Sequence, residues 1–277
     1  FIYGVFPLFL LSALFADACT IFMANDGKNV WIGANEDEIQ ATRYRMWFYP
    51  ANKKSYGYVI WSDLNIKPKF LNYLNPQGGL NEHGLFFDYT AIDDIPIVID
   101  EQKKDRKEQI GTDLLEYCKT VDEALAYISK FNLIKLNAAQ LFIGDASGNY
   151  ATVTVGYVEK KTDNSFALTN YPINNGQKRA CHRRDVATNY LNLNSTFQLS
   201  DITNILDKVA QRYPVNATTN LSFAVNLKTT TINLYYKHDF TTAAVISLGE
   251  ELKKGKHQKD FENYFPENIA PILEKTY

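Results

Sequence analysis

The sequence has few cysteines and few histidines, three and four respectively in 277 residues. Three scattered cysteines do not make the framework of a disulfide-rich domain. Cys118 and Cys181 can still pair in an exported protein and leave Cys19 free, and the sequence equally allows that no cysteine pairs. The histidines lack the spacing of metal ligands, so we expect neither a metal site nor a cofactor.

The chain also lacks an excess of charge and a long internal apolar run. Lysine and arginine number 29 against 31 aspartates and glutamates, which leaves a net charge of −2 with no basic stripe. This balance argues against binding to the phosphates of nucleic acid. No segment beyond the amino terminus is long and apolar enough to span a membrane. Repeats, low-complexity tracts and clear linkers are absent as well, and the length allows one large domain or two small ones.

The amino terminus carries the one strongly apolar run. Residues 2–15 are almost purely apolar, but the run is too short and too close to the terminus for a typical spanning helix. It ends in Ala16-Asp17-Ala18, an A-x-A cleavage pattern. We therefore predict a signal peptide over residues 1–18, cleaved after Ala18, and an exported protein that is secreted or periplasmic. The alternative is a helix that anchors the chain in a membrane.

Cleavage after Ala18 makes Cys19 the first residue, and two explanations fit a cysteine there. One is a bacterial lipoprotein. Its signal usually has a Leu-like residue three positions before the cysteine and a small residue two before it, where this chain has Ala16 and Asp17. The other is chemical use of Cys19. A thiol has a pKa of about 8.5 and an α-amine one of about 8, so the amine of residue one can serve as the base for its own thiol.

Alternating apolar residues predict a chain rich in β-strands. Residues 20–24 and 29–34 form two apolar runs around an Asp-Gly turn, the pattern of a hairpin. Aromatic residues are abundant, with 18 Tyr and 17 Phe, which fits strands and also an apolar substrate pocket. Further strands are expected within residues 43–61, 84–92, 138–170 and 221–248.

Two segments have the spacing of amphipathic helices. Residues 120–131 open with a capping box formed by Thr120 and Glu123, and residues 200–213 carry a single apolar stripe. The highly charged residues 99–109 are expected to be an exposed loop or helix surface, and the polar residues 250–262 a surface loop. Many strands with a few helices indicate a sandwich of sheets and helices.

Four short segments, each a weak signal alone, occur in a fixed order along the chain. They are Cys19-Thr20 with residues 33–37 (Gly-Ala-Asn-Glu-Asp), residues 79–85 (Gly-Leu-Asn-Glu-His-Gly-Leu), residues 142–148 (Phe-Ile-Gly-Asp-Ala-Ser-Gly) and residues 168–172 (Leu-Thr-Asn-Tyr-Pro). Their order and spacing, with a cleavage pattern directly before the cysteine, resemble the choloylglycine hydrolase and penicillin V acylase family of linear amide hydrolases. The resemblance spans roughly residues 19–190.

The resemblance implies a fold class, an activity and a kind of ligand. It implies an α+β fold, the four-layer αββα sandwich of the N-terminal-nucleophile hydrolases, with residues 19–277 as the catalytic domain. It implies hydrolysis of a non-peptide C–N amide bond in a small-molecule N-acyl substrate, without a metal or cofactor. No nucleic-acid partner and no stable membrane span after removal of the leader are expected, and a homo-oligomer is compatible with the pattern.

The resemblance also assigns roles to individual residues. Cys19 matches the nucleophile, and Asp37 matches the acidic residue beside it, which orients the α-ammonium. Asn170 matches the oxyanion donor, and a side-chain amide aimed at a tetrahedral oxygen is suited to that task. Asn81 and Ala91 fall at substrate- or oxyanion-binding positions. A family Asn is replaced by Ala91, whose backbone N–H can still donate.

The chain departs from the family pattern at two arginines. The family carries Arg directly after the glycine of the first motif, where this chain has Ala34, so a cation that lowers the pKa of the thiol and touches substrate is missing. Arg43 or Arg45 can replace it only if the fold brings one of them near. A late family Arg corresponds to Arg183 or Arg184, with Arg183 preferred. Specificity for bile salts is therefore not implied.

Two other functions remain compatible with the sequence. The same fold can transfer the acyl group to an amine instead of water, which makes the protein an acyltransferase. Alternatively, the chain is a lipidated or secreted binding protein in which Cys19 is only an anchor and no catalysis occurs. The chemical state of the mature amino terminus separates the second alternative from the enzyme.

Overall fold

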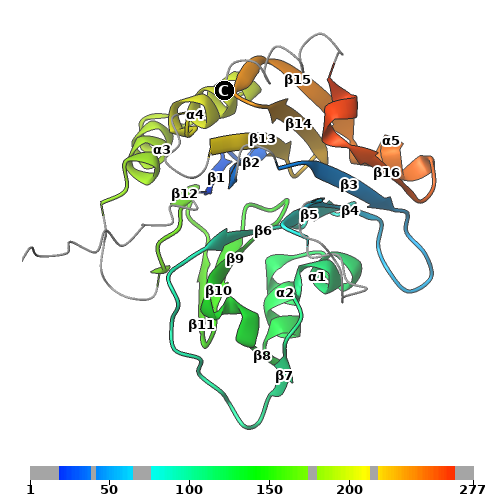
Figure 1. Ribbon diagram of the computed structural model, residues 1–277, viewed down its shortest axis with the longest axis vertical. Helices are drawn as coiled ribbons and strands as arrows, with labels where there is room; N and C mark the ends of the chain where they lie inside the picture. The colour runs from blue at the N-terminus through cyan, green and yellow to red at the C-terminus, as the bar shows by residue number, and fades with distance from the viewer. Residues whose placement is uncertain (1–18, 39–41, 65–75, 174–179, 213–217, 266–277) are drawn as a thin grey trace, which may run out of the picture.

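The computed structural model describes residues 19–38, 42–64, 76–173, 180–212 and 218–265. Within them, two antiparallel sheets stack face to face, and helices lie on both outer faces (Figure 1). The predicted leader, residues 1–18, lies outside the described residues.

The first sheet is built around the predicted hairpin of β1 and β2. Thr20 pairs with Asn35, and the register continues to the turn. At the turn the Asp26 carboxylate accepts the N–H groups of Lys28 and Asn29, while Gly27 takes a positive φ of 80° that favours glycine. The strand order is β12-β1-β2-β13-β14-β15. The bounds are β1 Thr20–Asn25, β2 Val30–Glu38, β12 Ser165–Leu168, β13 Thr218–Asn226, β14 Thr231–Tyr236 and β15 Asp239–Ser247.

The second sheet takes most of its strands from the middle of the chain, in the order β11-β10-β9-β6-β5-β4-β3-β16. The strands predicted within residues 43–61, 84–92 and 138–170 are confirmed. The bounds are β3 Tyr44–Tyr49, β4 Tyr58–Asp63, β5 Gly78–Asn81, β6 Phe86–Ala91, β9 Ala139–Gly144, β10 Tyr150–Thr154, β11 Tyr157–Lys161 and β16 His257–Asp260.

Both predicted helices are present, and the described residues contain three further α-helices that were not predicted. Thr120 caps the first predicted helix by accepting the N–H of Glu123, and the Glu123 carboxylate accepts the N–H of Lys119. The unpredicted α3 has only Ala187 and Leu191 buried, so its apolar stripe is weak in the sequence. The bounds are α1 Gly111–Tyr117, α2 Val121–Ile128, α3 His182–Leu193, α4 Leu199–Val209 and α5 Leu248–Lys253.

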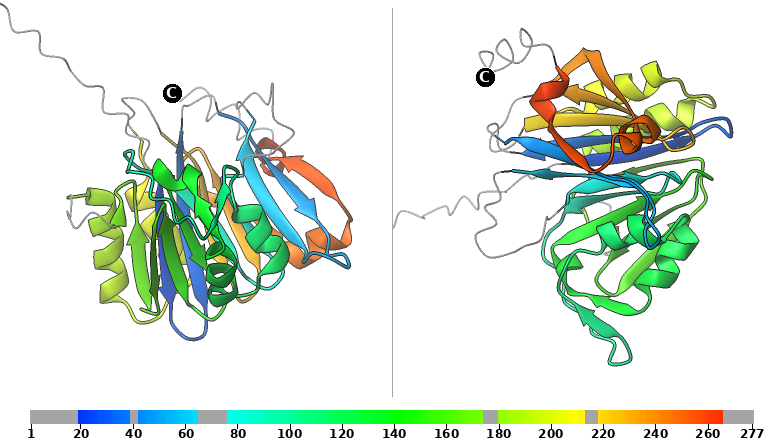
Figure 2. Two further views of the ribbon diagram at one scale, coloured as in Figure 1. Left: turned by 90° about the horizontal axis from the view of Figure 1, so that it is seen from below. Right: turned by 90° about the vertical axis from the view of Figure 1, so that its right-hand side faces the viewer.

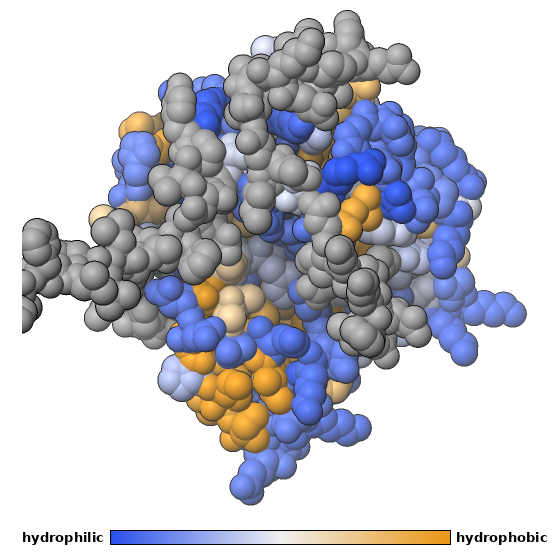
Figure 3. All heavy atoms as spheres, in the orientation of Figure 1, coloured by the Kyte–Doolittle hydropathy of each residue, from blue (hydrophilic) through white to orange (hydrophobic). Residues whose placement is uncertain are grey.

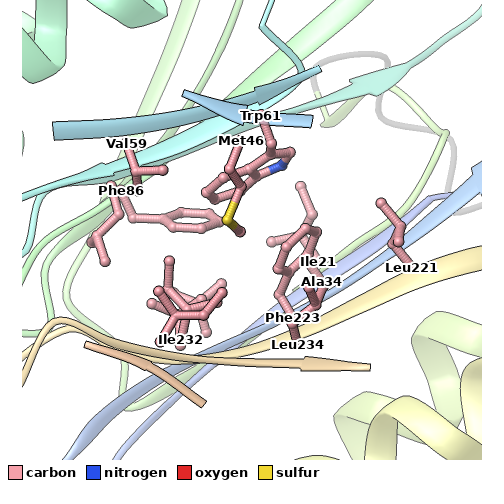
Figure 4. Packing of buried hydrophobic residues seen from close by; sticks show 14 of the residues in the cluster. Ile21, Ala34, Met46, Val59, Trp61, Phe86, Leu221, Phe223, Ile232 and Leu234 are labelled. Carbon is pink, nitrogen blue, oxygen red and sulfur yellow. The ribbon is translucent and has the colours of Figure 1, made fainter. Parts of the chain in front are cut away.

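Three apolar cores separate four layers, as Figure 2 shows from two sides. Along β1, Ile21 and Met23 face the second sheet, whereas Phe22 and Ala24 face α3 and α4. The outer face of the second sheet packs on α1 and α2. Figure 4 shows the core between the sheets, where Trp61 lies opposite residues of the first sheet. The layers run helix, sheet, sheet, helix, so the predicted αββα sandwich is confirmed.

The prediction of a surface loop over residues 250–262 is wrong. α5 ends within this segment, β16 pairs with β3 as an edge strand, and the 3₁₀ helix Phe261–Tyr264 follows. Phe261 is fully buried in the core between the sheets. The polar composition misled the prediction because an edge strand needs few apolar side chains.

The charged segment 99–109 is exposed, as predicted, and contains a short strand. Strand β7, Lys104–Arg106, pairs in parallel with β8, Phe131–Leu133, ahead of a 3₁₀ helix at Ile134–Asn137. Three exposed hydrophobic residues precede β7: Ile97, Val98 and Ile99. A hydrophobic patch in the lower half of Figure 3 lies where Figure 1 draws β11 and the segment leading to β7.

The pairing of Cys118 with Cys181 does not occur. Both cysteines are free and buried. Cys118 follows α1 on the outer face of the second sheet, whereas Cys181 precedes α3 on the outer face of the first. The two sheets separate them, which is too far for a disulfide. Among the described residues, no helix has the length and apolarity needed to cross a membrane.

Candidate active site

Cys19 lies directly before β1 and continues the row of side chains that faces the second sheet. Ile21 and Met23 belong to this row and are buried between the sheets. Side chains alternate along a strand, so the Cys19 thiol points into the same interior. Its Sγ donates a hydrogen bond to Glu36 Oε2 at 3.5 Å. The hairpin register agrees, because Thr20 pairs with Asn35 and the next pair outward is Cys19 with Glu36.

The surroundings of Cys19 favour the protonated thiol. Burial raises the pKa of the thiol well above its ordinary value, and the negative charges of Glu36, Asp37 and Asp88 raise it further. A hydrogen bond from the Asp37 backbone N–H lowers it by less. Charged forms are disfavoured by both burial and like charge, so the thiol needs a base, or a nearby cation, before it can act as a nucleophile.

Arg183 joins three of the residues that the sequence predicted. It is the second residue of α3, and its Nη1 donates to the carbonyl oxygen of Cys19 at 3.1 Å and to Thr20 Oγ1 at 2.9 Å. The same nitrogen pairs with Asp37 Oδ2 at 3.3 Å. Nη2 donates to Asn170 Oδ1 at 3.4 Å. One guanidinium therefore spans the amino end of β1, the end of β2 and the segment after β12.

The neighbouring Arg184 lies elsewhere. Its Nε pairs with Asp185 at 3.8 Å within the same helix. Consecutive residues of a helix are rotated by about 100° from one another, so only one of these two arginines can face Cys19. Of the two alternatives left by the sequence, Arg183 is the arginine in contact with the predicted site.

Asp37 is buried on the outer face of the first sheet, opposite in direction to Glu36. Its Oδ2 pairs with Arg183, and its Oδ1 accepts the hydroxyl of Thr219 from the neighbouring strand β13. Burial raises the pKa of Asp37, while the Thr219 hydrogen bond and the Arg183 charge oppose that rise. Arg183 thus links the Asp37 carboxylate to the Cys19 backbone. The carboxylate and the Cys19 thiol lie on opposite faces of the sheet.

Asn170 and Ala91 come together from the two sheets. Asn170 Nδ2 donates to the carbonyl oxygen of Ala91 at 2.9 Å. The predicted contribution of Ala91 was its N–H, whereas the observed contact uses its carbonyl oxygen. Ile92 donates to Ala138 at 3.1 Å, and Ala91 is paired with Ala139; because hydrogen-bonded and non-bonded pairs alternate, the N–H and carbonyl of Ala91 both point away from β9.

The Asn81 side chain uses all its hydrogen-bonding positions within the fold. Its Nδ2 donates to the carbonyl oxygens of Leu115 at 3.0 Å and Cys118 at 2.8 Å. Its Oδ1 accepts the N–H of His83 at 3.1 Å and that of Leu85 at 3.0 Å. A primary amide has two donors and two acceptor positions, and all four are used. These contacts give no support to the predicted substrate-binding role, since the side chain fastens the β5–β6 turn to α1.

Neither Arg43 nor Arg45 replaces the arginine missing at Ala34. Both pair with Asp260 of β16, and Arg43 also pairs with Glu262 at 3.2 Å. On β3 the buried residues Tyr44, Met46 and Phe48 face the first sheet, so the arginines point to the other face. Ala34 is fully buried between the sheets.

Two buried carboxyl groups that the sequence analysis did not assign lie at the thiol. Glu36 is 2% exposed and Asp88 is not exposed. They come from different sheets, β2 and β6, and their carboxyl groups lie close enough to affect each other's pKa. The signal was present in the alternation. Glu36 follows Ile32 and Ala34 in the row facing the second sheet, and Asp88 follows Phe86 in the row facing the first. Figure 4 shows Ala34 and Phe86 in this interior.

Solved structures of amide hydrolases are similar to this chain. A penicillin V acylase from Agrobacterium tumefaciens is 16% identical with a TM-score of 0.64, over 87% of this chain and 90% of that one. A variant of the conjugated bile acid hydrolase from Clostridium perfringens is 12% identical with a TM-score of 0.68, over 88% and 96%. The N-acylethanolamine-hydrolyzing acid amidase ortholog of Caenorhabditis elegans is 19% identical with a TM-score of 0.53, over 76% and 93%.

The chain therefore has the fold of the N-terminal-nucleophile hydrolases, and identities this low establish the fold alone. No protein-family model and no curated protein sequence matches it.

Proposed function

We propose that the protein hydrolyses a non-peptide amide bond in a small N-acyl substrate, with Cys19 as an amino-terminal nucleophile after residues 1–18 are removed. The observation that carries this proposal is the position of Arg183. Its guanidinium contacts the Cys19 carbonyl, the Asp37 carboxylate and the Asn170 amide at once. Three residues selected from the first and fourth sequence segments thus meet around one side chain, on a fold shared with acylases and amidases.

In the proposed reaction the freed α-amine takes the proton of the Cys19 thiol, and the thiolate attacks the amide carbonyl. The C–N bond breaks, the leaving amine takes up the proton, and a thioester remains on Sγ. Water then attacks the thioester, with its proton passing to the α-amine, and the acid is released. No metal or cofactor takes part in these steps.

The charges around Cys19 suit an amino-terminal ammonium group. The Asp37 carboxyl group is linked to the Cys19 backbone by Arg183, which donates to the Cys19 carbonyl oxygen. A freed ammonium group is stabilised by nearby carboxylates. The ammonium group is also a cation near the thiol. In this proposal it takes the role of the family arginine that Ala34 replaces.

In this proposal Asn170 stabilises the oxyanion. Its Oδ1 is held by Arg183 and one hydrogen of its Nδ2 is held by the Ala91 carbonyl. A primary amide carries a second Nδ2 hydrogen, and a donor whose orientation is set in advance is effective in the transition state. Arg183 acts in this arrangement as a positioning residue for both the nucleophile and the oxyanion donor.

The experiment compares two forms of the protein on a panel of chromogenic N-acyl amides with apolar, aromatic and dicarboxylic acyl groups. One form begins at Cys19 with any initiator Met removed, and the other keeps a single extra residue before Cys19. We expect turnover only in the first, because an amide nitrogen cannot act as a base. Mass spectrometry verifies the free amino terminus of the first form. Equal rates in the two forms would show that another group activates Cys19.

A further inference from the structure

The acid pair formed by Glu36 and Asp88 is not needed for the proposed steps, and yet it is the nearest titratable neighbour of the Cys19 thiol. Glu36 Oε2 accepts the thiol hydrogen at 3.5 Å. Behind it, the Asp88 carboxyl group of the second sheet lies close enough to Glu36 for each to affect the pKa of the other. Both groups are buried in the layer between the sheets.

Two ionised carboxylates in contact inside a protein repel each other strongly, so one of them keeps a proton. The thiol contact favours Asp88 as the protonated member, because Glu36 accepts the hydrogen of Cys19 and an ionised oxygen is the stronger acceptor. Asp88 Oδ1 accepts the backbone N–H of Tyr89 at 2.7 Å, whereas Asp88 Oδ2 is buried and receives no N–H or hydroxyl donor among the described residues. A proton on Oδ2, donated to Glu36, satisfies this buried oxygen. Glu36 then accepts from Asp88 on one side and from the thiol on the other.

We propose that Glu36 and Asp88 share a single proton, carried by Asp88, and that the charge left on Glu36 holds the Cys19 thiol in its protonated form. This deepens the proposed function and rests on it for the identity of the nucleophile. A thiol held in this way reacts slowly until a base removes its proton. The pair thereby makes Cys19 dependent on the α-amine that cleavage releases.

The other charged groups around the pair are accounted for. On β2, Asp37 faces the opposite side of the sheet and is paired with Arg183 from α3. Glu38, two residues beyond Glu36, accepts a hydrogen bond from Gln77 at 3.2 Å. From β3, Tyr44 lies close enough for Glu36 and Cys19 to affect it, and burial raises its pKa well above the ordinary value, so it stays neutral. Asp63, at the end of β4, affects Tyr44 as well.

Burial raises the pKa of Glu36 to about 7, against hydrogen bonds from Asp88 and Cys19, and burial with the charge of Glu36 raises that of Asp88 well above its ordinary value. These directions agree with a pair that carries one proton near neutral pH. Removal of the last negative charge from the pair should therefore lower the pKa of the thiol.

The test measures the alkylation rate of Cys19 by iodoacetamide as a function of pH in the full 277-residue chain, with the modified residue identified by mass spectrometry. In this chain the Cys19 nitrogen is an amide, so no α-amine contributes, and no substrate turnover is needed. Failure of the acylase proposal would therefore leave the result unaffected. The variants are Asp88→Asn, Glu36→Gln with Asp88→Asn, and the control Glu38→Gln.

Asp88→Asn mimics the protonated acid, since its amide can donate to Glu36, so we expect the midpoint of its pH–rate profile to stay within about 0.3 pH unit of wild type. The double variant has no charge at the pair, and its midpoint should fall by about one pH unit or more. Glu38→Gln should resemble wild type. If the double variant does not fold, Glu36→Gln with Asp88→Ser, which also leaves no charge at the pair, should shift the midpoint in the same direction.

Two results would overturn the proposal. A fall with Asp88→Asn as large as that of the double variant would mean that both carboxyl groups are ionised and share no proton. An unchanged midpoint in a folded variant that lacks both carboxyl groups would mean that the pair has no influence on the thiol.

Discussion

At the scale of single residues, the candidate site has an unusual balance of charge. A small apolar residue, Ala34, lies where the family that the sequence resembles has an arginine. Two positions later, Glu36 adds a buried carboxyl group. Arg183 is the cation that contacts the Cys19 backbone, and it does so on the helix-facing side of the sheet. The thiol itself faces carboxyl groups. In the proposed mechanism the base that activates Cys19 is therefore its own amino group.

The first residue-scale prediction concerns Cys19→Ala in the form that begins at position 19. Turnover of N-acyl amides should fall below detection, because no other described residue has a nucleophile arrangement at this site. The fold should be kept, since the β-carbon remains and only the thiol contact with Glu36 is lost. Circular dichroism and thermal melting check the fold. Residual turnover in a clean preparation would move the nucleophile to another residue.

The second concerns Asn170→Ala. We expect kcat to fall by about 10²–10³-fold, the usual effect of losing one oxyanion donor, while KM changes much less. The control is Asn149→Ala, which removes an asparagine from the turn between β9 and β10 and should leave both constants unchanged. A higher KM with unaltered kcat would instead assign Asn170 to substrate binding.

At the scale of elements, strand alternation decides which groups meet. Thr20 and Asp37 point to the helix-facing side of the first sheet, where Arg183 reaches them. Cys19 and Glu36 point to the other side, into the interior between the sheets. Two adjacent residues of β2, Glu36 and Asp37, therefore serve opposite faces of the sheet. The sequence motif alone does not show which face of the sheet each side chain points to, but the pairing register of the strands does.

The prediction at this scale concerns Asn81, which joins β5 to α1. Asn81→Ala leaves two backbone N–H groups and two carbonyl oxygens of a buried turn without their partner, so we expect it to lower the free energy of unfolding by about 2–4 kcal/mol. Asn52→Ala, in an exposed turn, should change it by less than about 0.5 kcal/mol. Urea unfolding of both variants measures the difference.

Asn81→Ala also has a second readout. The pH dependence of Cys19 alkylation should be unchanged in the folded variant, because Asn81 contacts α1 and its own turn rather than the thiol. A variant of wild-type stability with impaired amide turnover would restore the substrate-binding role that the sequence motif suggested for this residue.

At the scale of the whole molecule, the buried carboxyl groups lie between two stacked sheets, far from water. The sequence-distant strands β2 and β6 bring Glu36 and Asp88 together only because the sheets face each other. The low polarity of that layer disfavours a second negative charge. Stability of the sandwich and ionisation of the site are therefore linked, and pH acts on both.

This linkage gives the whole-molecule prediction. The pKa of Glu36 is about 7 in the folded chain against an ordinary value of 4.5, so its contribution to stability is complete below pH 4.5 and is lost as the pH rises toward 7. The loss is on the order of 3 kcal/mol, since one pKa unit corresponds to about 1.4 kcal/mol. Urea unfolding at a series of pH values should show this decline in wild type and a smaller one in Glu36→Gln. Parallel curves would contradict it.

Local sequence patterns were sufficient to predict much of the fold. The hairpin of β1 and β2, the capped helix α2 and the apolar stripe of α4 follow from alternation, turn residues and capping, which act over a few positions. β16 and α3 escaped prediction because their stability comes from neighbours: β16 completes the edge of a sheet, and α3 buries only two side chains.

The sequence by itself determined the candidate nucleophile, its acidic neighbour Asp37 and the amide of Asn170, because these residues sit in ordered motifs. Only the tertiary structure decided between Arg183 and Arg184, removed Arg43 and Arg45 from the site, and gave Asn81 a structural task. It alone paired Glu36 with Asp88. The physical reason is that contacts between residues 52 positions apart, on facing sheets, depend on strand direction and layer packing, which no short segment encodes.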